Sequence, residues 1–112
     1  MDNKDKKILE KLCRHIEATL LYCKGCQSLQ EFEADSMRVE ACVFNLMQIG
    51  ELAKTSLSDN AKAEITSIPW NQLYGMRNRI VHDYDGVAMT IVWDTINCDL
   101  PALIKKLRNT YN

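Results

Sequence analysis

The sequence has almost no β-strand signals, because apolar residues recur at helical spacing and not in alternation with polar ones. No apolar run approaches the ~20 residues that a membrane span needs, and the charged start of the chain has no apolar segment behind it. A chain of 112 residues is long enough for one core but too short for two. We therefore expect one all-α domain, residues 1–112, located in the cytoplasm with no membrane contact.

The chain also has little net charge. Fourteen basic residues stand against fifteen acidic ones, which leaves a formal charge of −1. Such a balance provides no general attraction to nucleic acid. Any binding of RNA or nucleotides must therefore depend on a local site.

The cysteines do not form a convincing redox or metal motif. Five is an odd number, and without an export signal we expect reduced, mostly buried thiols. A redox role for the Cys23-x-x-Cys26 motif would require a preceding strand, whereas the pattern there is helical. Cys13 and His15 are two residues apart, which puts them ~200° apart on a helix and prevents them from sharing a zinc ion. We expect no metal and no cofactor.

The first helical pattern covers residues 8–23 and predicts a helix that stops at Gly25. His15 lies on the apolar stripe of this segment. We expect it to be a packed histidine satisfied by one hydrogen bond, since that is the commoner role at such a position.

The second pattern begins at Asp35 or Ser36, either of which can cap a helix, and continues to Leu57. Its apolar surface is broad, which predicts neighbouring helices on more than one side. Gly50 lies within this surface and permits a close helix approach. Glu40 and Glu51 lie to one side of it, where they are either solvated or hold a cation such as Arg77.

The second half of the chain contains two more helical patterns. A polar connector, residues 56–68, has room for one short helical turn after Ser58, and Pro69 suits the first turn of a helix over residues 70–82. The last pattern, residues 89–107, keeps its phase through Pro101 and predicts a kinked helix or two nearly coaxial pieces. Four amphipathic helices with short connections predict an antiparallel four-helix bundle.

The third helix carries the most informative residues of the chain, Arg77, Asn78 and His82. Arginine offers a planar, permanently charged fork for phosphate oxygens, and histidine takes and gives a proton near neutral pH. Asn78 and His82 are four residues apart and share a helix face, which Arg77 reaches with its long side chain. The core stripe of this helix is Leu73, Met76 and Ile80.

The face with Asn78 and His82 points away from the core of the chain. Tyr74 and Val81 add apolar surface beside this face. Covering that surface would stabilise the protein, because exposed apolar patches favour association. We therefore expect a homodimer, in which a two-fold axis brings two sets of these polar residues into one cleft.

Taken together, the sequence around this helix resembles the HEPN superfamily, specifically its HepT-like toxin family. The resemblance rests on the R-x-x-x-x-H-x-Y pattern of Arg77, His82 and Tyr84, with a polar residue after the arginine and Pro-Trp before the helix. It extends to four further stretches, residues 38–40, 48–51, 91–93 and 99–101.

The resemblance implies a metal-independent endoribonuclease that acts as the toxin of a toxin–antitoxin pair. Arg77 and His82 would be catalytic, and Asn78 would orient the histidine or the substrate. RNA supplies its own nucleophile, the 2′-hydroxyl, so such an enzyme needs a base, an acid and charge stabilisation. The implied partner is a minimal nucleotidyltransferase (MNT) antitoxin, which in some members attaches AMP to the tyrosine that here is Tyr84.

Two other interpretations remain open at this point. The chain is alternatively a non-catalytic nucleotide-binding or regulatory subunit of a two-component nucleotidyltransferase. It is alternatively an interaction module whose dimer is the whole function, although an interface alone has little need of Arg77, Asn78 and His82 on one flank.

Overall fold

We describe the chain from a computed structural model, which covers residues 1–82 and 89–111; for Val81, His82 and Tyr111 only the helical backbone is described. All regular structure in this part of the chain is helical. The elements are α1 (Asn3–Tyr22), α2 (Leu29–Glu33), α3 (Ser36–Glu51), the π-helix η1 (Leu52–Ser56), α4 (Asp59–Glu64), α5 (Trp70–His82), α6 (Met89–Asp94), the π-helix η2 (Thr95–Asp99) and α7 (Leu100–Tyr111).

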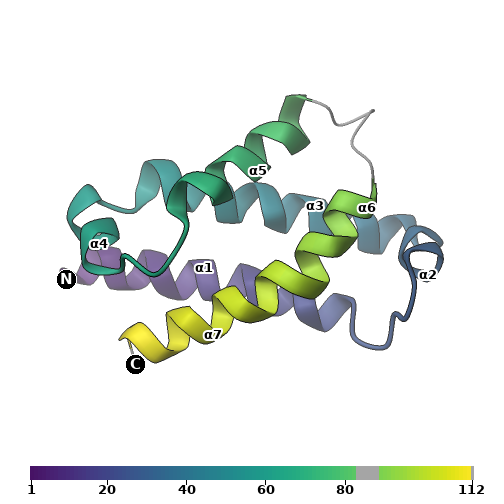
Figure 1. The fold of residues 1–112 in the computed structure, drawn as a ribbon, viewed down its shortest axis with the longest axis horizontal. Helices are drawn as coiled ribbons and strands as arrows, with labels where there is room; N and C mark the ends of the chain where they lie inside the picture. The colour runs from purple at the N-terminus through teal and green to yellow at the C-terminus, as the bar shows by residue number, and fades with distance from the viewer. Residues whose placement is uncertain (83–88, 112) are drawn as a thin grey trace.

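Four long helical segments form an antiparallel bundle, as the sequence predicted (Figure 1). α1 lies between α3 and α7, and α3 lies between α1 and α5. The two ends of the chain lie at the same end of the bundle. None of the described helices is long and apolar enough to cross a membrane.

α1 ends where the sequence predicted. Asp2 caps its start by accepting a hydrogen bond from the backbone of Asp5, and Gly25 follows its end with a φ of 89°. Only glycine adopts such a left-handed conformation readily, so the chain can turn sharply there. His15 Nδ1 lies 2.9 Å from Asn45 Oδ1, and its ring meets Phe44 edge-on. The prediction of a packed, hydrogen-bonded histidine is confirmed.

α3 begins after Asp35, whose side chain accepts a hydrogen bond from the backbone of Arg38. The predicted cap is thus confirmed. The helix does not continue regularly to residue 57, because it widens into the π-helix η1 after Glu51. Thr55 lies in this segment and donates its hydroxyl to the Glu51 carbonyl oxygen at 2.8 Å.

The connector between α3 and α5 contains the predicted short helical turn, α4, which Ser58 caps. Pro69 precedes α5, and its carbonyl oxygen accepts hydrogen bonds from the backbone of Gln72 and Leu73. The indole of Trp70 donates to the Ile65 carbonyl oxygen at 3.0 Å. These bonds fix the direction in which α5 leaves the connector.

The regular α-helix of the last segment is interrupted before Pro101 and not at it. Proline has no N–H to donate and crowds the carbonyl one turn earlier. The five residues of η2 precede α7 and widen the helix at that point. Asn97, within η2, donates its side-chain amide to the Trp93 carbonyl oxygen at 2.8 Å. The predicted interruption is therefore present, although it takes the form of a π-helix.

One short helix, α2, was not predicted. Its Ser28 cap accepts a hydrogen bond from the Glu31 backbone. Phe32 is fully buried and packs against Trp93, with the ring centroids 5.4 Å apart. Five residues are too few to show a helical period, which explains why the pattern was missed.

A buried carboxylate, Asp5, joins the start of α1 to the start of α4. It accepts hydrogen bonds from the hydroxyl of Ser58 at 2.6 Å and from the backbone N–H of Ser58 at 3.0 Å. Both bonds favour the ionised form, so they lower the pKa of Asp5 from its usual value. A carboxyl group with a lowered pKa stabilises the fold above the unfolded-state pKa and loses that contribution as the pH falls through the folded-state value.

We expect Asp5→Asn to lower the midpoint of thermal unfolding at pH 7, since the amide replaces one acceptor of the Ser58 bonds with a donor. The difference from the parent should begin to shrink below about pH 4, where Asp5 of the unfolded chain takes up a proton, and should disappear as the pH falls through the lower pKa of the folded state. Asp59→Asn is the control, because Asp59 lies in the first turn of the same helix α4 but is fully exposed. An equal loss at pH 3 and pH 7 for Asp5→Asn would contradict this account.

Candidate active site

The candidate site depends on a close crossing of α3 and α5 at Gly50. A Cβ atom at this position would lie 2.3 Å from the Cβ of Arg77 and 2.9 Å from the Leu73 carbonyl oxygen. No side chain larger than hydrogen fits without moving α5. The close helix approach predicted at Gly50 is therefore confirmed, and it places the stem of Arg77 directly over α3.

Arg77 is held by three neighbouring side chains. Its Nε lies 3.2 Å from Glu51 Oε2, and its Nη1 donates to Asn78 Oδ1 at 3.0 Å. The guanidinium carbon lies 5.8 Å from the centre of the Tyr74 ring, a distance at which a cation is attracted to the ring face. Of the two alternatives for Glu51, holding the cation Arg77 is the one observed.

Arg77 starts off the outward face of Asn78 and His82 and reaches the Asn78 side chain with its long stem, as the sequence predicted. Its side chain is only 26% exposed, because the crossing with α3 covers the stem. The cover that α3 gives to the stem could not be predicted, because a wheel places side chains on one helix and does not include the neighbouring helix.

His82 is the last residue of α5, and the backbone of this helix carries it one turn beyond Asn78. This spacing puts the two residues on the same helix face. The His82 side chain and all of Tyr84 lie outside the described part of the structure. The structure thus brings together Arg77 and Asn78 and sets the helical position of His82.

Among the described residues, the partners of Arg77 occupy only one side of its guanidinium. Glu51 takes Nε and Asn78 takes Nη1, while no described residue accepts from Nη2. Lys54 adds a second positive charge nearby, with its Nζ 5.3 Å from the centre of the Tyr74 ring. A guanidinium held by protein partners on one side presents its remaining N–H groups in a fixed direction, which suits a phosphate oxygen.

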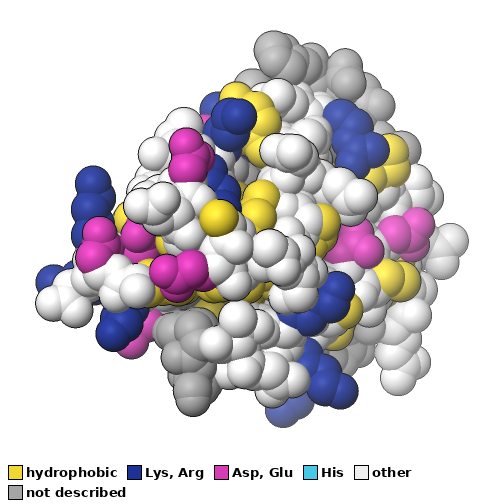
Figure 2. All heavy atoms as spheres, turned by 60° about the vertical axis from the view of Figure 1, so that its left-hand side comes forward, with side chains coloured by type: hydrophobic (Ala, Val, Ile, Leu, Met, Phe, Trp, Pro, Cys, Tyr) yellow, Lys and Arg dark blue, Asp and Glu magenta, His cyan; other side chains and the backbone are white. Residues whose placement is uncertain are grey.

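Charges elsewhere on the surface are mixed. On the face at the α4 end of the bundle, acidic and basic side chains are interspersed (Figure 2). The distribution agrees with the net charge of −1 and provides no broad basic surface on that face. Electrostatic binding of a polyanion would depend on local groups such as Arg77.

The buried cysteines Cys23 and Cys42 are not candidates for a reactive group. Cys23 and Cys42 have their Sγ atoms 3.6 Å apart, and burial raises the pKa of both thiols. Such thiols are poor nucleophiles because the thiolate is the reactive form. Within residues 1–82 and 89–111, no group of three or more potential ligand side chains is arranged to hold a metal ion.

A family model and several relatives match this chain over most of its length. The model of a family described as ribonuclease HepT-like matches residues 9–110, nearly the whole chain. The chain belongs to this family of the HEPN superfamily.

Two relatives of the HepT-like chain cover most of its length. A protein of Caldanaerobacter subterraneus subsp. tengcongensis, named "Putative RNase TTE0752", is 32% identical over 100 residues, covering 89% of the chain and 88% of the relative. A protein of Thermococcus cleftensis, named "Probable ribonuclease HepT", is 29% identical over 111 residues, covering 96% and 99%. No solved structure matches the chain.

Sequence reasoning missed two features of the HepT-like chain. The first is the contact of Tyr74 with both Lys54 and Arg77, since Tyr74 was interpreted only as apolar surface. The second is a cavity of about 500 Å³ on another flank of α5, facing η2 and α7. Gly75, in the middle of α5, is among the residues that line this cavity.

Proposed function

We propose that this HepT-like chain is a metal-independent endoribonuclease and the toxin of a toxin–antitoxin pair in the cytoplasm. The observation that carries the proposal is the fixed guanidinium of Arg77, held by Glu51 and Asn78, on the same helix as His82. Family membership supports the ribonuclease activity.

In the proposed reaction, His82 removes the proton from the 2′-hydroxyl of the RNA, and the 2′-oxygen attacks the adjacent phosphorus. The bond from phosphorus to the 5′-oxygen breaks, and that oxygen takes a proton from an acid. The products are a 2′,3′-cyclic phosphate and a 5′-hydroxyl. Arg77 stabilises the negative charge that builds up on the phosphate oxygens, and stabilisation of this kind contributes more to many enzymatic rates than any other single effect. Asn78 orients Arg77, to which it is hydrogen-bonded.

One histidine cannot act as base and acid in a single step, which supports a homodimeric site. A two-fold axis beside α5 would place a second His82 across the same cleft. One His82 then acts as base and the partner's His82 acts as acid. The protein needs no metal for this chemistry, because the nucleophile belongs to the RNA and the charge is met by Arg77.

The antitoxin that fits the family is a minimal nucleotidyltransferase. We propose that it transfers the adenylyl group of ATP to Tyr84: the tyrosine oxygen loses its proton and bonds to the α-phosphorus, and pyrophosphate leaves. The added negative charge two residues after His82 would repel the RNA backbone.

The test combines cleavage and expression. The purified chain should cut single-stranded RNA in excess EDTA and leave 2′,3′-cyclic phosphate ends, and His82→Ala should not. Expression of the chain alone should arrest growth, and coexpression with the neighbouring gene's product should relieve the arrest with a mass increase of one AMP on Tyr84.

Each measurement has a result that would contradict the proposal. Saturable nucleotide binding without RNA cleavage would replace the ribonuclease by a nucleotide-binding or regulatory subunit. Cleavage that stops in EDTA would refute metal independence. Full neutralisation with an unmodified Tyr84 would mean that the antitoxin acts by binding alone.

A further inference from the structure

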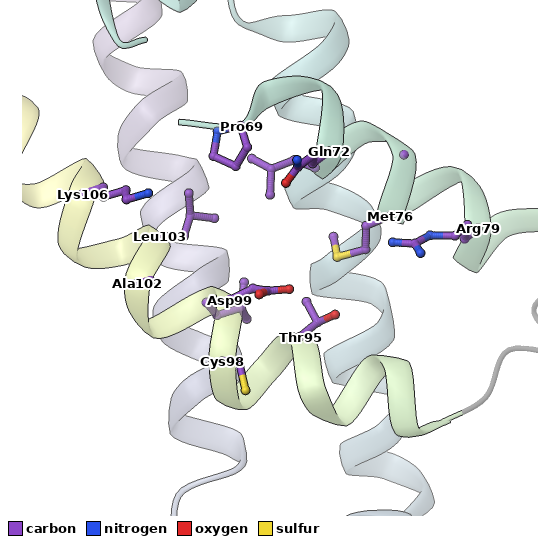
Figure 3. Close-up of a pocket in the computed structure, with 13 residues that line it drawn as sticks. Pro69, Gln72, Met76, Arg79, Thr95, Cys98, Asp99, Ala102, Leu103 and Lys106 are labelled. Atoms are coloured by element: carbon purple, nitrogen blue, oxygen red, sulfur yellow. The ribbon is translucent and has the colours of Figure 1, made fainter. Parts of the chain in front are cut away.

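The cavity on the second flank of α5 is lined by α5 on one side and by η2 and α7 on the other. Its floor is apolar and made by the buried side chains Leu73, Met76, Leu100 and Leu103. Its rim is polar. Gln72 and Arg79 reach it from α5, Asp99 from η2 and Lys106 from α7 (Figure 3). A volume of about 500 Å³ falls in the range of small-ligand pockets.

Gly75 lines the cavity and leaves the α5 backbone accessible from it. Glycine in the middle of a helix is less stable than alanine, and here a Cβ atom would meet nothing within 4 Å. Packing among the described residues requires a glycine at position 50 but not at position 75. A glycine at position 75 would be required by an occupant of the cavity that touches the α5 backbone.

The charges on the rim favour an anionic occupant that also carries hydrogen-bond donors. Arg79 and Lys106 are exposed and have no ion-pair partner among the described residues. Figure 3 shows them entering the cavity region from opposite ends, with the Asp99 carboxylate between them. Phosphates suit the two cations, whereas a carboxylate accepts from the N–H groups of a base edge.

The cavity lies on the flank of α5 next to Asn78. Gly75 and Arg79, which line it, are ~60° and ~100° from Asn78 around the helix. The Arg77 guanidinium reaches Asn78 from the other side. This helix carries Arg77 and Arg79 and no acidic residue. Asn78 lies three residues after Gly75 and next to Arg79, so these groups fall within about one helical turn, ~5.4 Å along the axis. A strand whose phosphate is at Arg77 can reach the cavity with a neighbouring nucleotide.

We propose that this cavity binds an unpaired nucleobase of the RNA substrate, next to the nucleotide that is cut. The base lies on the Met76 and Leu103 floor with its edge toward Asp99, and the flanking phosphates contact Arg79 and Lys106. The inference rests on the proposed ribonuclease function. It predicts a requirement for single-stranded RNA, since a paired base cannot enter.

The experiment measures binding separately from cleavage. In a His82→Ala background, a fluorescent single-stranded RNA of ten nucleotides is titrated with the parent and with Gly75→Leu and Lys106→Glu. Each variant should weaken binding about tenfold, Gly75→Leu by filling the cavity and Lys106→Glu by reversing a charge. Lys105→Glu is the matched control, because Lys105 is exposed on the same helix and does not line the cavity. It should change binding less than twofold.

The outcomes separate the two proposals. If Gly75→Leu unfolds the chain, RNA binding by Lys106→Glu alone tests the cavity proposal. RNA binding equal to that of the parent in a folded variant would overturn the cavity proposal. If the same variants instead abolish capture of the coexpressed antitoxin while RNA binding is unchanged, the occupant is a protein and the proposal is wrong. Failure of the unaltered chain to cleave any RNA would refute the ribonuclease function independently.

Discussion

Arg77→Ala is expected to lower the rate of RNA cleavage about 100- to 1000-fold while leaving the fold intact. Removal of one group that stabilises transition-state charge typically has an effect of this size. Arg77→Lys should recover little of the rate, because an ammonium group cannot contact Glu51 and Asn78 and also point a third donor in a fixed direction. The measurement is single-turnover cleavage of a labelled RNA with enzyme in excess.

Two variants separate catalysis from stability in this experiment. Arg108→Ala removes another partly exposed arginine that pairs with a glutamate, Glu17, on a different part of the bundle, and should leave the cleavage rate within twofold. Glu51→Gln keeps Arg77 but replaces its ionic partner with an amide, so its rate should fall between those of the parent and Arg77→Ala. Unchanged cleavage by a folded Arg77→Ala variant would show that the catalytic assignment is wrong.

Gly50→Ala is expected to destabilise the chain and to inactivate it more than the lost stability explains. The added methyl group would lie 2.3 Å from the Arg77 Cβ, so α5 must move away from α3. Overpacking of this kind costs about 1–3 kcal/mol. Because a displacement of about 1 Å at a catalytic group can reduce a rate about 100-fold, cleavage should fall by a similar factor in the fraction that remains folded.

Gly75→Ala provides the matched comparison, since it makes the same substitution in the middle of the facing helix. Its Cβ meets nothing within 4 Å, and alanine is the better helix former, so this variant should be about 0.5–1 kcal/mol more stable than the parent. Urea unfolding of both variants tests the pair. If Gly50→Ala were as stable as Gly75→Ala, the close crossing at Gly50 would not be what positions Arg77.

Local patterns were sufficient to predict the helices because their signals lie within a few residues. Apolar spacing predicted the bundle, Asp35 and Ser58 predicted two helix starts, and Gly25 predicted a stop. The five-residue α2 was missed because it is shorter than two helical turns. The π-helices η1 and η2 were missed because each is only five residues long, a single turn that an apolar pattern over a longer window does not resolve.

For the candidate site as well, some features follow from the sequence and others only from the tertiary structure. The sequence alone determined that Arg77, Asn78 and His82 share one helix, since their spacing and the family resemblance are properties of one segment. Only the tertiary structure decided that Glu51 pairs with Arg77 and that Gly50 supports its stem, because these contacts join helices separated by more than twenty residues. The cavity beside Gly75 likewise exists only where α5 faces η2 and α7, and the spacing of residues along one helix does not specify how far the next helix lies from it.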